Sequence, residues 1–175
     1  KTFTGLEVLP KRWFDGMWKT TSGNPLFLEE VLKSLIDAGT LFDRTGLKIN
    51  DTVPIPSSVR QITERRLAAL APLPLEIAQV LASGERAWSL PELSQVSGRP
   101  ADEVAEAMGD LQGGGLVRCE SDRWWLKGNL MAPIIVGLSD SKKRMERHGR
   151  IGRFLEETGS GNVEELALHF WEAKE

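Results

Sequence analysis

The chain has 175 residues, with 41% hydrophobic and 27% charged residues and a formal net charge of −3. That length suffices for one or two small domains, and the mild acidity does not suit general nucleic-acid binding. The single cysteine, Cys119, excludes an internal disulfide framework and a cysteine-based zinc site. No apolar run approaches the roughly 18 residues that span a membrane, and no signal core precedes the first helix. We expect a cytoplasmic protein and, because the chain starts at Lys1, a piece of a longer one.

The N-terminal third predicts two helices, over residues 10–21 and 25–38. In the first, a stripe of four large side chains at helical spacing predicts a core face: Trp13, Phe14, Met17 and Trp18. The second begins with Asn24 as N-cap and Pro25 at the first helical position, and Gly39 is suited to its end. Its apolar face is expected to contain Leu28, Val31, Leu32, Leu35 and Ile36.

A hairpin and a basic helix follow. Residues 41–49 predict a short β-hairpin around a polar turn at 43–46. Ser58 and Gln61 have capping-box spacing, so a helix is expected from Ser58 to about residue 70. Its apolar face is expected to comprise Val59, Ile62, Leu67 and Leu70. Two interpretations stay open for its basic residues, a solvated face or contact with nucleotide phosphate or an ATPase core: Arg60, Arg65 and Arg66.

Residues 71–138 predict helices over 74–83, 90–97 and 100–112, the last ended by three glycines at 113–115. Strands are then expected at 116–120 and 124–127, around a turn at 121–123. Three helices followed by a strand pair is the order of a winged helix, a helix-turn-helix variant. A short helix beginning at Pro133 completes this part.

The last part predicts a long helix to Glu157, preceded by possible N-caps at residues 139–141. It is strongly basic, and docking on an acidic partner or simple solvation are both compatible with that charge: Lys142, Lys143, Arg144, Arg147, Arg150 and Arg153. Asn162 with Glu165 predicts the start of another amphipathic helix.

Residues 21–30, Thr-Ser-Gly-Asn-Pro-Leu-Phe-Leu-Glu-Glu, resemble the end of the nucleotide-binding module of STAND-type P-loop ATPases, which are related to AAA+ proteins. The likeness extends to Pro-Ile-Pro-Ser-Ser-Val-Arg at 54–60, the three helices and hairpin, the basic helix, and Glu-Glu-Leu-Ala-Leu-His-Phe at 164–170. This order is similar to the C-terminal half of maltose-regulator-type and kinase- or cyclase-fused regulators. Where that family usually has a His-Asp pair after the wing, this chain has residues 128–130, Gly-Asn-Leu.

The resemblance implies a mainly α fold with small β-hairpins. It implies a helical lid segment over 1–70, a winged-helix domain over 71–138, and at 139–175 a basic helix with the start of a tetratricopeptide-like sensor. In the family, the Gly-x-Pro step carries the proline that closes over bound nucleotide, so the implied site is Gly23, Asn24 and Pro25. ATP or ADP would bind in the full-length parent rather than tightly to this fragment. The implied partners are the upstream ATPase core and the downstream helical sensor of the same chain.

The chain carries no motif for catalysis of its own. It has no Gly-x-x-x-x-Gly-Lys-Ser/Thr phosphate loop, since the glycines at 113–115 are followed by Leu116 and Val117. His148 and His169 lack metal-ligand spacing, and no Gly-x-Ser-x-Gly elbow is present. We therefore expect the fragment not to be an enzyme, although its parent is expected to be an ATPase.

The alternative is a winged-helix DNA-binding transcriptional regulator. A recognition helix offers cations and amides to DNA, whereas residues 101–112 carry four carboxylates and no Lys or Arg: Asp102, Glu103, Glu106 and Asp110. That charge makes DNA an unlikely partner. A protein-interaction scaffold unrelated to nucleotides is the third possibility.

Overall fold

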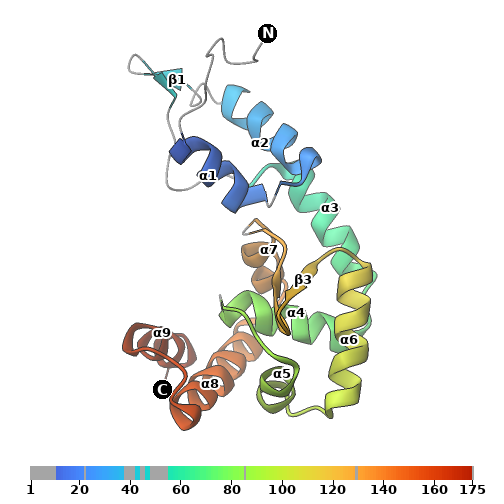
Figure 1. The fold of residues 1–175 in the computed structure, drawn as a ribbon, viewed down its shortest axis with the longest axis vertical. Helices are drawn as coiled ribbons and strands as arrows, with labels where there is room; N and C mark the ends of the chain where they lie inside the picture. The colour runs from blue at the N-terminus through green and yellow to red at the C-terminus, as the bar shows by residue number, and fades with distance from the viewer. Residues whose placement is uncertain are drawn as a thin grey trace. The chain divides into compact units, whose positions relative to one another are not determined.

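The computed structural model describes residues 11–21, 23–37, 42–43, 46–47, 55–84, 86–128 and 130–174. The fold is mainly helical with two small antiparallel strand pairs, as the sequence predicts (Figure 1). The chain forms two compact units, one of residues 1–62 with 128–130 and the other of residues 63–127 with 131–175. The division into segments 1–70, 71–138 and 139–175 stays a prediction. Ala38, Gly39 and the side chain of Trp13 lie outside the described part.

In the first unit, α1 (Lys11–Thr21) packs on α2 (Pro25–Asp37). The buried side chains of this helix pair are Met17, Thr21, Phe27, Val31 and Leu35. The prediction that Phe14 and Trp18 belong to the core is wrong, because their exposed fractions are 56% and 55%. The two rings stack on each other instead, with centroids 6.2 Å apart.

The buried face of α2 differs in part from the predicted one. Phe27, which was not on that face, is buried at 4% exposure, whereas Leu28 and Leu32 are half-buried. Ile36 is 40% exposed. The buried face of α2 is therefore the one that carries Phe27, Val31 and Leu35.

The described strands of the first hairpin are β1 (Phe42–Asp43) and β2 (Gly46–Leu47), which pair antiparallel as a hairpin is expected to. Asp43 and Gly46 were expected in the turn but pair with each other in the sheet. Helix α3 (Ser57–Ala68) begins one residue before the predicted start. Ser58 therefore lies inside the helix and cannot cap it, so the predicted capping box is wrong. The Ser58 hydroxyl donates a hydrogen bond to the Glu30 carboxylate of α2. The buried residues of α3 are Val59, Thr63 and Leu67, while the predicted core residues Ile62 and Leu70 are half-buried.

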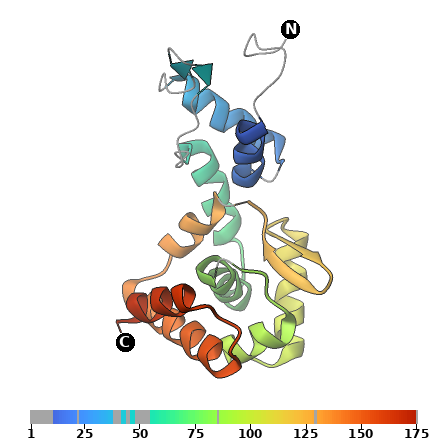
Figure 2. The ribbon, with the colours of Figure 1, turned by 60° about the vertical axis from the view of Figure 1, so that its left-hand side comes forward.

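The second unit is built around α4 (Pro72–Gly84), seen nearly end-on in Figure 2. Around it lie α5 (Leu90–Ser97), α6 (Ala101–Gly113), α7 (Met131–Gly137) and α8 (Ser141–Thr158), and it also contacts the hairpin strand β4. Helix α9 (Val163–Ala173) packs on α8 (Figures 1 and 2). Helix α4 begins at Pro72, two residues before the predicted start, because a proline suits the first turn, where its missing N–H is not needed.

The second hairpin joins β3 (Val117–Glu120) to β4 (Arg123–Leu126). Its loop has two residues, Ser121 and Asp122, both with positive φ (49° and 61°), as the tight turns between twisted strands require. Arg123 was expected in the turn but pairs with Glu120 in the sheet.

Local signals fix the ends of the remaining helices. Ser89 and Glu92 form a reciprocal capping box at α5, Asp140 caps α8, and Asn162 caps α9 as its spacing with Glu165 predicts. Helix α7 begins at Met131, so the predicted start at Pro133 falls instead within its first turn. The core of the unit includes the fully buried Trp88, whose ring centroid lies 5.7 Å from that of Phe154.

Candidate functional site

The implied nucleotide-closing step forms a tight corner between α1 and α2. Gly23 has a φ of +72°, a conformation that L side chains rarely adopt. The Asn24 side-chain oxygen accepts hydrogen bonds from the backbone N–H of Leu26 (3.1 Å) and of Phe27 (3.5 Å). Pro25 is exposed at the first position of α2. The capping geometry predicted for Asn24 is therefore present, and Pro25 is accessible.

An exposed aromatic ring lies against this corner. A Cβ added to Gly23 would lie 2.5 Å from Cζ3 of Trp18, so only glycine leaves room for that ring. Trp18 in turn stacks on Phe14. This surface is not predictable from the helical spacing of the two rings, because that spacing is equally typical of a core face.

Two arginines of the basic helix α8 turn inward. Arg147 is 2% exposed, and its guanidinium donates to Ser83 Oγ (3.0 Å), Gln79 Oε1 (2.9 Å) and Ser139 Oγ (3.1 and 3.2 Å). Arg150 donates to the Glu76 carboxylate (3.1 Å) and to the Ser97 carbonyl (3.3 Å). These contacts fasten α8 to α4, to the end of α5 and to the segment before α8. The predicted roles of this helix, solvation or docking on a partner, are therefore wrong for these two side chains.

The hydrogen-bond partners of Arg147 among the described residues are all neutral. Burial, together with the nearby charges of Arg150 and Arg144 and against the effect of Glu76, lowers the pKa of Arg147 to about 10. At neutral pH the guanidinium is still charged. A buried charge that has no carboxylate as a hydrogen-bond partner is stabilised only by its neutral polar partners, so the loss of any one of them is costly.

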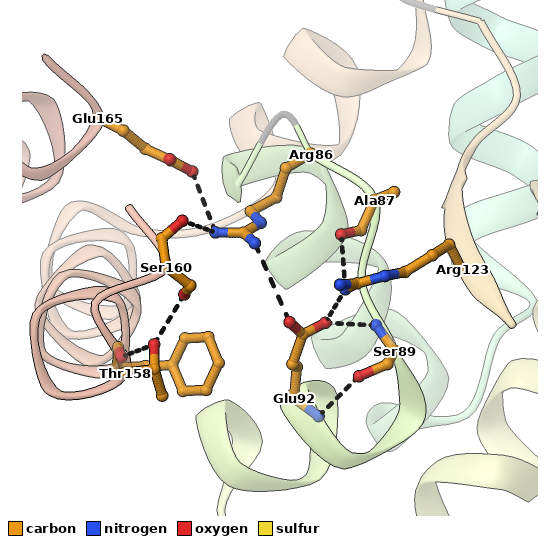
Figure 3. Close-up of polar contacts among 9 residues, drawn as sticks. Arg86, Ala87, Ser89, Glu92, Arg123, Thr158, Ser160 and Glu165 are labelled. Atoms are coloured by element: carbon orange, nitrogen blue, oxygen red, sulfur yellow. Dashed lines mark hydrogen bonds and ion pairs between the residues drawn. The ribbon is translucent and has the colours of Figure 1, made fainter. Parts of the chain in front are cut away.

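A second cluster, the Arg86 cluster, joins the α8–α9 connection to α5 and the hairpin (Figure 3). Arg86 lies between three oxygen groups: Glu92 at 4.0 Å, Glu165 at 3.7 Å and the Ser160 carbonyl at 3.3 Å. Glu92 also accepts a hydrogen bond from Arg123 of β4 and one from the Ser89 backbone. A continuous polar path therefore runs from α9 to the hairpin.

A buried histidine pair lies between α8 and α9. The Nδ1 atoms of His148 and His169 are 3.0 Å apart, and the two residues are 7% and 1% exposed. Burial lowers the pKa of both rings, that of His169 to about 4 with further opposition from His148 and Arg86. The pairing of these histidines was not predicted from the sequence, where they lie 21 residues apart. One signal in the sequence was available: His148 is at helical spacing from Ile151, and His169 from Ala173, so each histidine lies on the apolar face of its helix.

A groove of about 760 Å³ runs between α4 and α8. Its lining includes the cations Lys143, Arg147, Arg150 and Arg153 and the carboxylates Glu76, Asp140 and Glu146. The opposite charges nearly balance, so the groove has no strong preference for an ion of either sign.

The charges of α6 face solvent. Asp102, Glu103, Glu106 and Asp110 are all exposed, whereas Val104, Ala107, Met108 and Leu111 are buried. A polyanion approaching this face would meet four carboxylates, which repel it.

Comparison with protein-family models, with curated proteins and with solved structures finds no match. Within the described ranges, no three His, Cys, Asp or Glu side chains are grouped so that they could hold a metal ion. No helix in the part that the structure describes has the length and apolarity needed to cross a membrane.

Proposed function

We propose that this chain is the regulatory segment of a STAND-type signal-transduction ATPase. It would couple the nucleotide state of the parent to a winged-helix domain and a helical sensor through intramolecular protein contacts. The observation that carries the proposal is the inward attachment of the basic helix α8. Arg147 and Arg150 bind α4 and α5, so this helix serves contacts within the chain.

The second unit supports a winged helix that is joined to a sensor. Helices α4, α5 and α6 precede the β3–β4 hairpin in the required order. The Arg86 cluster connects this hairpin to the start of α9 (Figure 3). Val163, Leu168 and Trp171 of α9 are exposed apolar side chains, as expected of a helix in a stacked array.

The corner at residues 23–25 supports the nucleotide-reading role. Pro25 is exposed on a backbone that Gly23 and Asn24 hold in one conformation. The nucleotide would shift the population between a closed and a released arrangement only if its contacts with this proline differ between the two arrangements.

The first experiment measures ADP and ATP affinity of the full-length parent by calorimetry. Pro25→Ala should weaken the binding of at least one nucleotide and change signalling output. Pro91→Ala is the matched control, since Pro91 is also exposed in the first turn of a helix, α5. Unchanged affinity and output in Pro25→Ala would refute the role of Pro25, and absence of nucleotide binding by the parent would favour a scaffold.

The second experiment tests the polar path in the 175-residue chain. Glu165→Gln should shift the backbone NMR signals of β4, because Arg86 and Glu92 connect the two elements. In an Arg86→Gln background the same change should no longer reach β4. The exposed neighbour Glu164→Gln is the control. Equal shifts with and without Arg86 would mean that the cluster does not carry the coupling.

The DNA-binding alternative has the element order in its favour and the charge of α6 against it. It predicts tight, salt-dependent binding of duplex DNA by the chain. Fluorescence anisotropy at two salt concentrations distinguishes the two, since our proposal expects no such binding.

A further inference from the structure

Helix α9 is attached to the rest of its unit mainly through α8. The centre of that contact holds two imidazoles rather than an apolar pair. Gly152 of α8 gives the close approach, since an added Cβ would lie 3.1 Å from the Phe170 ring and 3.4 Å from the His169 Cβ. Water is thus largely excluded from the two rings.

The distance between the two Nδ1 atoms, 3.0 Å, is that of a hydrogen bond. One Nδ1 must donate a proton and the other must accept it, so one ring carries Nδ1–H while the other is protonated at Nε2. One further proton can be added without breaking this bond. A second further proton places an N–H on both facing atoms and a positive charge on both rings, which the contact cannot hold.

We propose that His148 and His169 form an acid-sensitive latch. The latch keeps α9 docked on α8 as long as no more than one proton is added to the neutral pair. Such a latch would control whether α9, the start of the proposed sensor, stays attached to α8. Only its role in signalling rests on the function proposed above.

The charged groups around the pair determine the order of the two steps. Glu172 of α9 favours a proton on His148, whereas Arg147 and Arg144 of α8 oppose it. Arg86, before α5, opposes a proton on His169. A charged His148 also opposes a proton on His169. We therefore expect the first added proton on His148, while the second, on His169, opens the latch. The two steps are properties of the pair and are observed as coupled titrations.

The sign of the pH dependence follows from the lowered pKa values. A free histidine has a pKa near 6.5, so both rings bind protons below that pH when α9 is undocked. In the docked state burial lowers the pKa of both rings, and that of His169 falls to about 4, so the docked state binds fewer protons in this range. Docking is complete above pH 6.5 and is lost as the pH falls through that window.

Amide hydrogen exchange of the 175-residue chain at pH 6.5 and 4.5 tests the latch. Protection factors of α9 should fall at least about tenfold, while those of α6 in the same unit change much less. His169→Asn keeps an oxygen acceptor near the Nδ1 position but cannot be protonated, so its α9 protection should fall much less with pH, leaving only the contribution of His148. Unchanged α9 protection in the unmodified chain, or an equal fall in His169→Asn, would overturn the proposal.

Imidazole ¹⁵N titration of the unmodified chain tests it without a substitution. Two coupled transitions below pH 6.5, the lower one coinciding with the loss of α9 protection, are expected. Protonation of both rings while α9 stays protected would refute the latch. Neither measurement involves nucleotide, so failure of the latch is distinguishable from failure of the Pro25 experiment.

Discussion

Helices α6 and α8 are both highly charged, yet they use their charges in opposite ways. The four carboxylates of α6 are exposed, and its contacts with α4 and α5 are made by apolar residues. Helix α8 exposes Lys142 and Lys143 but buries Arg147 and half-buries Arg150 against the same two helices. A long arginine can cover apolar surface with its stem and still satisfy its head group, whereas a short carboxylate at an exposed position gains nothing by turning inward.

The comparison teaches that a run of charge along a helix does not determine what the charge is for. The position of α8 that buries an arginine, 147, shares the stripe of Ile151 and Leu155, which lie one and two turns away. What distinguishes a helix that uses its charges for internal contacts from a solvated one is the position of the charged residues relative to the apolar stripe. The number of charges does not distinguish them.

The largest expected effect is that of Arg147→Met. The change takes the guanidinium away from three neutral acceptors, of which Ser83 is buried and Gln79 and Ser139 are half-buried. Because these acceptors lose their charged donor, the free energy of unfolding should fall by about 1 to 3 kcal/mol. Urea unfolding measures it. Lys142→Met, at a side chain that is 86% exposed, is the control and should change stability by no more than about 0.5 kcal/mol. A loss below about 1 kcal/mol for Arg147→Met would contradict the attachment role.

Two glycines extend the comparison to packing. On α6, an added Cβ at Gly109 meets nothing within 4 Å, so Gly109→Ala should stabilise by about 0.5 to 1 kcal/mol through helix propensity. On α8, Gly152→Ala would crowd Phe170 and should lose that gain, giving a net change near zero or a loss of about 1 kcal/mol. Thermal unfolding of both variants gives the difference. A greater gain at Gly152 than at Gly109 would show that α9 is not closely packed on α8.

The smallest expected effect is that of Glu106→Lys on the exposed face of α6. Stability should change by less than about 0.5 kcal/mol, because the side chain is solvated. The urea midpoint is again the measurement. A shift equivalent to more than about 1 kcal/mol would mean that the acidic face makes a structural contact after all.

Much of the candidate site could be placed from the sequence, but its surroundings could not. Asn24 caps α2 as its position before Pro25 predicts, since capping needs only neighbouring residues. The exposure of Trp18 beside Gly23 was not predictable, because spacing gives a stripe without saying whether another element covers it. The Arg86 cluster joins residues up to 79 positions apart, as Arg86 and Glu165 show, and no local pattern marks such a contact.

The ends of most helices, and the tight hairpin that follows α6, could be read from the amino-acid sequence alone. These features depend on caps, prolines, glycines and periodicity within a few residues of each other, and local free energies decide them. Only the tertiary structure decided that Phe14 and Trp18 face solvent, that Arg147 is buried, and that His148 meets His169. Each of these depends on which segment distant in sequence covers a given face, and burial and the pairing of polar groups across that contact determine it.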